Sequence, residues 1–158
     1  MFFRLYQPGD FAQLYAVEEP CFQPPCRFSR AYMRKIIQSP RSATWIAEEE
    51  SRLIGFAIVS WGRESEPHGA YIQTVEVAKE HRGEGVGREL LRRIEDSARA
   101  AGARAIWLHV DVENLSAIRL YERHGYERQG REEHYYARNR AAFSYTKSLA
   151  QPAPRPAL

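Results

Sequence analysis

The sequence predicts a single domain of the mixed α/β class. Its 158 residues suit one domain with a sizeable core. Short runs rich in Ile, Val and aromatic residues alternate with segments whose apolar residues recur at helical spacing, which is typical of α/β proteins. Alternating prolines near the end of the chain can join neither a sheet nor a helix. We therefore expect residues 1–149 to form the domain and residues 150–158 to be a disordered tail.

The first half of the chain predicts a strand, two helices and three further strands. Asp10 is a suitable N-cap for the first helix, and Ser29 for the second. Prolines exclude a helix over residues 20–28, which we expect to be an irregular apolar loop. A short hairpin turn near Ser51 joins the first two of the three strands. In order, the predicted elements are strand 2–6, helix 10–18, helix 29–38 and strands 43–49, 53–61 and 70–78.

The second half begins with the clearest helix of the chain, residues 85–101, whose apolar residues form a single stripe. Gly102 provides the left-handed residue that ends it. The next strand, residues 105–110, is apolar except for His109, so we expect it to be buried on both faces. Asn114 caps the next helix. The remaining predicted elements are helix 115–124 and a hairpin of strands 126–135 and 141–149.

Charge and cysteine content argue against several function classes. The 23 basic and 20 acidic residues leave a net charge of +3, and twenty of the basic residues are arginine, which suits a small phosphorylated ligand. Acidic partners at helical spacing argue against nucleic-acid binding. Cys21 and Cys26 are too few for a metal quartet or a disulfide framework, so we expect reduced thiols and no metal. The expected ion pairs are Glu89–Arg93, Glu95–Arg99 and Arg119–Glu122.

The sequence also predicts a cytoplasmic protein without a membrane partner. No apolar run approaches the ~20 residues of a membrane span. Arg4 places a charge where a signal peptide would have its apolar region.

The strongest local pattern is a glycine-rich turn, with Gly83, Gly85 and Gly87 between a strand and the best helix. Glycines let the backbone approach a ligand closely, and the first-turn N–H groups of a helix attract anions. Together they indicate a pyrophosphate site. The dinucleotide fingerprint fails because Arg88 stands where its third glycine belongs. A P-loop fails because its lysine is missing.

This turn and a second segment resemble the GNAT superfamily of acetyl-CoA-dependent N-acetyltransferases. Arg82-x-x-Gly85-x-Gly87 resembles the pyrophosphate motif of that family. The segment from Asn114 to Tyr126 resembles its N-x-x-A-x-x-[Leu/Phe]-Tyr-x-x-x-Gly-[Phe/Tyr] motif. The resemblance extends over residues 2–149 in the element order β-α-α-β-β-β-α-β-α-β-β. It implies a GNAT-like central mixed sheet that splays between strands 4 and 5, with acetyl-CoA in the split.

The resemblance also implies which residues contact acetyl-CoA. Backbone N–H groups near Val77 would hold the acetyl carbonyl and the pantetheine, and the glycine turn would hold the pyrophosphate. Asn114 would meet the pantetheine arm as well as cap its helix. Arg88 either reaches a phosphate or is a solvated charge. The implied contacts are Val75, Val77, Arg82, Gly83, Glu84, Gly85, Val86, Gly87, Arg88, Asn114 and Tyr121.

Acetyl transfer to an amine needs a neutral amine, a polarised carbonyl and a proton for the leaving thiolate. In the family, a tyrosine at the position of Tyr121 donates that proton, although a tyrosine there also suits the core. The resemblance implies His109 as the base, with Tyr71 sharing the role through a water molecule. Glu76 is the rival base, and solvent is a third possibility, because a free α-amine has a pKa of about 7.7–8.0.

Within the superfamily, the chain most resembles the protein N-terminal acetyltransferases. Trp107-Leu108-His109-Val110 precedes the second motif as a similar run does in those enzymes, and residues 20–28 occupy the place of their substrate loop. The implied acceptor is the N-terminal amine of a protein or peptide, bound by a monomer or homodimer. A small amine or a lysine side chain is the alternative acceptor, and an inactive CoA-binding sensor is the non-enzymatic alternative. The implied acceptor contacts are Phe22, Pro25, Tyr71, Tyr135 and Tyr136.

Overall fold

The computed structural model describes residues 1–21, 28–137 and 140–150, and for residues 19–21, 136 and 137 it describes the backbone alone. Two predicted acceptor contacts, Phe22 and Pro25, therefore lie outside the described residues, as do Cys26 and residues 151–158 of the predicted tail. No helix within the described part is long and apolar enough to cross a membrane.

Within the described residues, seven strands form one mixed sheet in the order β1-β2-β3-β4-β5-β7-β6. The order of elements along the chain confirms the sequence prediction. The elements are β1 Phe2–Leu5, α1 Phe11–Cys21, α2 Arg30–Gln38, β2 Ser42–Glu49, β3 Arg52–Arg63, β4 Glu66–Val77, α3 Val86–Ala100, β5 Ala105–Asp111, α4 Leu115–Arg123, β6 Glu127–Ala137 and β7 Arg140–Ser148, with short 3₁₀ helices η1 Pro8–Asp10 and η2 Lys79–His81.

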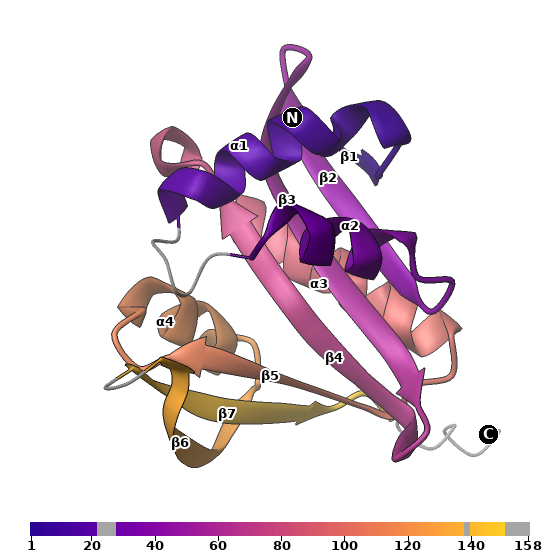
Figure 1. Cartoon of the computed structure of the whole chain (residues 1–158), viewed down its shortest axis with the longest axis vertical. Coiled ribbons are helices and arrows are strands. Elements are labelled where there is room, and N and C mark those ends of the chain that lie inside the picture. The colour runs from indigo at the N-terminus through magenta and orange to yellow at the C-terminus, as the bar shows by residue number, and fades with distance from the viewer. Residues whose placement is uncertain (22–27, 138–139, 151–158) are drawn as a thin grey trace, which may run out of the picture.

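Helices cover both faces of the first four strands, with α1 and α2 on one face and α3 on the other (Figure 1). Leu14 of α1 and Met33 of α2 pack against Phe56 on the first face. Leu90 and Ile94 of α3 pack against the second face. All five side chains are fully buried, and each is worth about 1.5–3 kcal/mol of transfer free energy. Because apolar clusters pack on both faces, β3 and β4 are a rigid support for the side chains at the end of β4.

Strands β4 and β5 pair in parallel only at their beginning. The paired positions are Gly69 with Ala105, Ala70 with Ile106 and Tyr71 with Trp107. Beyond Tyr71 the two strands diverge, while β5 continues to pair with β7 along its whole length (Figure 1). The structure therefore confirms the predicted split between the fourth and fifth strands.

A β-bulge interrupts β4 at the point where the split opens. Thr74 pairs with Ile58 of β3, but the next partner of β3, Val59, pairs with Ile72, so Gln73 is an extra residue in β4. A bulge sends two consecutive side chains to the same face and bends its strand. The bend and the missing ladder bonds help to explain why β4 leaves β5 here.

The bulge also decides which side chains share a face of the sheet. Residues paired across antiparallel strands lie on the same face. Glu76 pairs with Phe56, which packs under α1 and α2. Tyr71 pairs with Ser60, which is four residues after Phe56 and therefore on the same face of β3. Strict alternation would have put Glu76 and Tyr71 on opposite faces. The bulge puts both on the face covered by α1 and α2.

Three local predictions were wrong. Helix α1 continues through Pro20 to Cys21, because a proline has a helical φ and removes only one hydrogen bond in a last turn. Asp10 is not an N-cap: it ends η1 and accepts a hydrogen bond from the backbone N–H of Gln7 at 2.7 Å. Glu122 contacts Arg128, at 3.5 Å, rather than Arg119. The other two expected pairs, Glu89–Arg93 and Glu95–Arg99, are present.

Strand β5 also departs from its prediction. Ile106 and Leu108 are fully buried against the α3 side, but Trp107 and His109 keep some exposure. The helices α1 and α2 lie over β2–β4, so the same face of β5 stays accessible (Figure 1). One face of β5 is therefore only partly buried, where the prediction had both faces buried.

Candidate active site

A pocket of about 1060 Å³ lies between the glycine-rich turn, the end of β4 and α4. It brings together every predicted contact of acetyl-CoA except Tyr121. The predicted residues that line it are Val75, Glu76, Val77, Arg82, Gly83, Glu84, Gly85, Val86, Gly87, Arg88 and Asn114.

The glycine-rich turn has a backbone shape that needs glycine at two positions. Gly83 has φ +81° and Gly85 has φ +84°, both in the left-handed region. Gly85 is the N-cap of α3, and the residues of the first turn that follow it, Val86–Arg88, line the pocket; the N–H groups of a first turn have no partner within the helix. Gly87 lies where the turn packs on α4: a Cβ there would lie 3.4 Å from Leu120, which is an ordinary van der Waals contact. The turn is thus an anion cradle that packs closely on α4.

Basic side chains from three elements surround the cradle. Arg82 comes from the turn, where its Nε donates to the carbonyl of Val77 at 3.2 Å. Arg88 comes from α3, and Arg119 and Arg123 come from α4. Arginine suits phosphate because it offers a fork of donors. Since Arg88 lines the pocket, the phosphate-contact alternative is favoured over the solvated one. The cradle and these arginines fit the pyrophosphate and phosphate groups of acetyl-CoA.

Asn114 fulfils its predicted capping role at the opposite wall of the pocket. Its Oδ1 accepts a hydrogen bond from the N–H of Ala117 at 3.3 Å, and the residue also lines the pocket. The predicted cap and the predicted pantetheine contact are therefore compatible in one position.

His81 ties the beginning of the cradle to the end of β2. Its Nδ1 lies 3.2 Å from Glu84 and 3.3 Å from Glu49. The Nδ1 atom of His81 and one carboxylate oxygen from each glutamate lie within 4.8 Å of one another. The contacts hold the turn against the β2–β3 hairpin, whose tight turn is confirmed by positive φ values at Glu50 and Ser51.

Tyr121 and Glu76 form a buried pair of polar side chains near the pocket. Glu76 is 4% exposed and accepts a hydrogen bond from the hydroxyl of Thr74 at 2.7 Å. Tyr121 is 5% exposed, and its ring centroid lies 5.5 Å from that of Tyr126. Burial, and to a lesser extent the negative charge of Glu76, raise the pKa of Tyr121 above its ordinary value. Tyr121 therefore keeps its proton throughout the neutral range.

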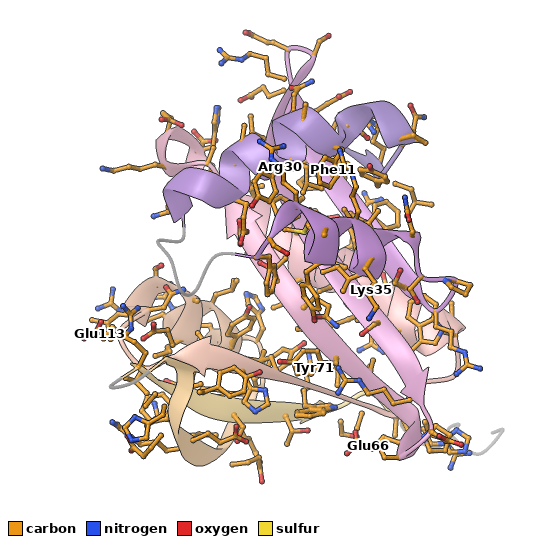
Figure 2. The ribbon with its side chains drawn as sticks, in the orientation of Figure 1. Phe11, Arg30, Lys35, Glu66, Tyr71 and Glu113 are labelled. Atoms are coloured by element: carbon orange, nitrogen blue, oxygen red, sulfur yellow. The ribbon has the colours of Figure 1, made fainter. Side chains whose placement is uncertain are left out.

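A second cluster of side chains spans the split between β4 and β5. The hydroxyl of Tyr71 lies 3.0 Å from Nδ1 of His109. The prediction of a water between them was wrong, because the two side chains are in direct contact. Figure 2 shows Tyr71 projecting from β4 toward β5 at the point of divergence. Trp107 packs edge-on against Tyr71, with ring centroids 4.7 Å apart.

Tyr135 closes this cluster from β6. Its ring stacks on the imidazole of His109, with centroids 4.4 Å apart and planes at 18°. Its hydroxyl lies 3.3 Å from that of Tyr71. The structure therefore brings Tyr135, a predicted acceptor contact, beside Tyr71 and His109, whereas the side chain of Tyr136 lies outside the described residues.

Sequence reasoning missed Glu132, whose Oε1 lies 3.2 Å from Nε2 of His109. No pattern in the last hairpin marks this residue, because β6 is irregular. Its pairing with β7 shifts register between Glu132 and Ala137, and His134 has φ +57°. A smaller pocket of about 630 Å³ reaches this place and is lined by Trp107, His109 and Glu132 among others.

Comparisons with known proteins identify the family. The family model of the acetyltransferase (GNAT) family matches residues 11–126. The chain is 32% identical over 135 residues to the N-alpha-acetyltransferase RimI of Mycobacterium tuberculosis. This alignment covers 85% of this chain and 78% of that protein. It is 34% identical over 114 residues to the streptothricin acetyltransferase of Streptomyces lavendulae. That alignment covers 72% of this chain and 59% of the relative.

The fold is also similar to solved structures. The crystal structure of the ribosomal-protein-S18-alanine N-acetyltransferase from Escherichia coli superposes with a TM-score of 0.81 and 19% sequence identity, and the match covers 99% of each chain. At this identity the likeness concerns the fold alone. The family match extends over most of the described sheet and both motif segments, and it ends at Tyr126. The chain belongs to the acetyltransferase (GNAT) family, a family of acyltransferases for which acetyl-CoA is the donor.

Proposed function

We propose that this chain transfers the acetyl group of acetyl-CoA to the N-terminal α-amine of a protein or peptide. The observation that carries the proposal is the cluster of Tyr71, His109 and Tyr135 at the apex of the split, where β4 and β5 cease to pair. It combines a base with two tyrosine hydroxyls that can hold the end of a peptide. The similarity to the RimI protein over 85% of this chain supports the same acceptor class.

On the donor side, acetyl-CoA supplies an acetyl thioester, which is the group to be transferred. The cradle at Gly83–Gly87 holds its pyrophosphate, and Arg88 and Arg119 hold phosphate charge. Val75, Glu76 and Val77 line the same pocket, and in this proposal their backbone N–H groups hold the acetyl carbonyl.

On the acceptor side, His109 is the group that removes a proton from the incoming ammonium, through Tyr71. An imidazole accepts a proton near neutral pH, and a free α-amine is only one to two pKa units above it. A lysine amine has an ordinary pKa of about 10.4 and needs far more help. The site is therefore better matched to an α-amine than to a lysine.

Glu76 has a different role in this proposal. It accepts a hydrogen bond from Thr74, and its charge acts on Tyr121. We assign Tyr121 as the proton donor to the leaving thiolate and Glu76 as the charge that helps to keep Tyr121 protonated. His109 is the preferred base because it is already in contact with Tyr71.

A second acceptor class rests on one observation, the 34% identity to streptothricin acetyltransferase. A small amine would need only the split itself, without contacts to a continuing peptide chain.

A panel of acceptors tests the proposal. It contains short peptides that differ in their first two residues, the same peptides with a blocked N-terminus and one internal lysine, and small amines that include streptothricin. Release of the CoA thiol from acetyl-CoA is measured with each. We expect release with free N-terminal peptides and little with the blocked ones. Release with streptothricin alone would overturn the peptide assignment.

A further inference from the structure

We propose that Glu132 is a positioning residue that sets the tautomer and orientation of His109 for deprotonation of the acceptor amine. This inference rests on the proposed role of His109 as the base. It concerns a residue of β6 that none of the sequence motifs includes. Its basis is the pair of contacts on the two imidazole nitrogens, Nδ1 to Tyr71 at 3.0 Å and Nε2 to Glu132 at 3.2 Å.

The carboxylate decides which nitrogen carries the proton. An ionised carboxylate is only an acceptor of hydrogen bonds, so Nε2 of a neutral His109 must carry the hydrogen and donate it to Glu132. Nδ1 is then left with its lone pair, and the hydroxyl of Tyr71 donates to it. Without a fixed acceptor at Nε2, the imidazole can also present Nδ1–H to the oxygen of Tyr71, and that tautomer cannot accept a proton from it.

The ring is also held in place by its neighbours. Tyr135 stacks on one side of the imidazole, with ring centroids 4.4 Å apart. Trp107 packs edge-on against the imidazole, with ring centroids 5.4 Å apart. These contacts define the plane of the ring but not its protonation. The side chain of His109 is 8% exposed, whereas that of Glu132 is 54% exposed. Glu132 therefore connects a nearly buried base to solvent.

Titratable side chains from two strands contact the imidazole, and Glu66, His68 and Arg104 line the same small pocket as His109. Tyr71 comes from β4, and Glu132 and Tyr135 come from β6. Arg63 of β3 lies over the ring of Tyr71 at 5.1 Å. Of the contacting side chains Tyr71, Glu132 and Tyr135, Glu132 is the one that carries a negative charge at neutral pH.

The proton balance follows from this arrangement. The acceptor ammonium gives a proton to the oxygen of Tyr71, while the hydroxyl proton of Tyr71 moves to Nδ1 of His109. The amine becomes neutral and the imidazole becomes a cation, with its Nε2–H directed at the carboxylate of Glu132. Over the whole reaction the ammonium loses two protons: one leaves to solvent from His109, and the other replaces the proton that Tyr121 gives to the sulfur of CoA.

The first test needs no substrate. Nitrogen-15 NMR of the imidazole side chains reports the tautomer of His109, assigned by comparison with His109→Ala. We expect a single Nε2–H tautomer in the unmodified protein and in Glu132→Gln, whose amide oxygen still accepts the hydrogen bond. In Glu132→Ala we expect a mixture of the two tautomers. An unchanged tautomer in Glu132→Ala overturns the proposal.

The second test is a double-mutant cycle in peptide acetylation. Partners that orient a histidine are typically worth about 10–100-fold, so Glu132→Ala should lower kcat by about that factor, with a smaller change in KM. In a His109→Ala background the same substitution should have no further effect. Glu133→Ala is the matched control, because Glu133 is exposed, adjacent and paired with Arg131. An equal loss in both backgrounds would assign the effect to something other than His109.

The two tests separate this inference from the proposed function. A mixed tautomer in Glu132→Ala together with no acetylation of peptides by the unmodified protein would reject the acceptor and keep the positioning role. Acetylation of peptides together with unchanged kcat in Glu132→Ala would keep the acceptor and reject the positioning role. Glu132 is exposed, so neither of its variants should affect folding, and the melting temperature checks this.

Discussion

The hydroxyl of Tyr71 and Nδ1 of His109 are 3.0 Å apart, and they join two strands that have just ceased to pair. Tyr71 lies on the last paired position of β4, and His109 lies two residues beyond its partner Trp107. Where the backbone pairing of β4 and β5 ends, the Tyr71–His109 hydrogen bond connects the two strands. The split is thus open to ligands from its wide end and closed by a polar contact at its apex.

This contact predicts non-additive losses of activity. Tyr71→Phe and His109→Ala should each lower kcat/KM for a peptide by about 10²–10⁴-fold, because each interrupts the same proton path. The double variant should be little worse than the poorer single one. Steady-state kinetics of the three variants measure this. Losses that multiply would show that the two residues act separately.

The two ends of α3 offer a matched test of the cradle. Gly85 and Gly102 both have left-handed φ values, +84° and +94°, and neither has a backbone atom near its missing Cβ. Gly85→Ala and Gly102→Ala should each lower the free energy of unfolding by about 1–2 kcal/mol. Only Gly85→Ala should also weaken acetyl-CoA binding, by about tenfold for each ~1.4 kcal/mol of crowding that the added Cβ causes against the bound phosphate. Calorimetric titration gives the affinities, and equal affinities for the two variants would contradict the cradle.

Removal of the Tyr121 hydroxyl should affect chemistry more than binding. Tyr121→Phe is expected to lower kcat by about 10²–10⁴-fold with little change in acetyl-CoA affinity. Because its pKa is raised, the group that donates the proton should not deprotonate between pH 9 and the ordinary tyrosine value of about 10. The pH dependence of kcat should therefore show no decline from Tyr121 in that interval. An unchanged kcat in Tyr121→Phe would show that Tyr121 contributes to core packing and not to proton transfer.

The N-terminal segment predicts a stability change that depends on pH. Arg4 donates to Asp10 at 2.8 and 2.9 Å, and this hydrogen bonding lowers the pKa of Asp10 below its ordinary 3.8. A lowered folded-state pKa stabilises the fold above the unfolded value and loses this effect as pH falls through the folded value. Asp10→Asn should therefore lower the free energy of unfolding by about 1–2 kcal/mol at pH 7. The difference should shrink below pH 4 in denaturant titrations, and a constant difference would refute the ionic origin.

Much of the architecture can be predicted from local patterns. The apolar stripe of α3, the capping residue Asn114 and the glycines of the cradle each leave a signature in adjacent residues. These signatures are local because helix periodicity, caps and left-handed turns depend on a few neighbouring residues.

Features that depend on strand pairing were not predictable. The extra residue Gln73 in β4 has no sequence signal, yet it puts Glu76 on the same face as Tyr71. The irregular β6 brings Glu132 to His109, although alternation along β6 does not indicate it. The sequence prediction also put a water between Tyr71 and His109, which are in direct contact. The distance across the split depends on how sharply β4 and β5 diverge, and the sequence does not give that angle.

The most direct measurement concerns the site of acetylation on one acceptor. A peptide with a free N-terminus and one internal lysine is incubated with the protein and acetyl-CoA, and tandem mass spectrometry then locates the acetyl group. The account predicts acetylation of the N-terminal α-amine alone, with loss of this product in His109→Ala. Acetyl on the lysine, or an unmodified peptide while streptothricin is acetylated, would contradict it.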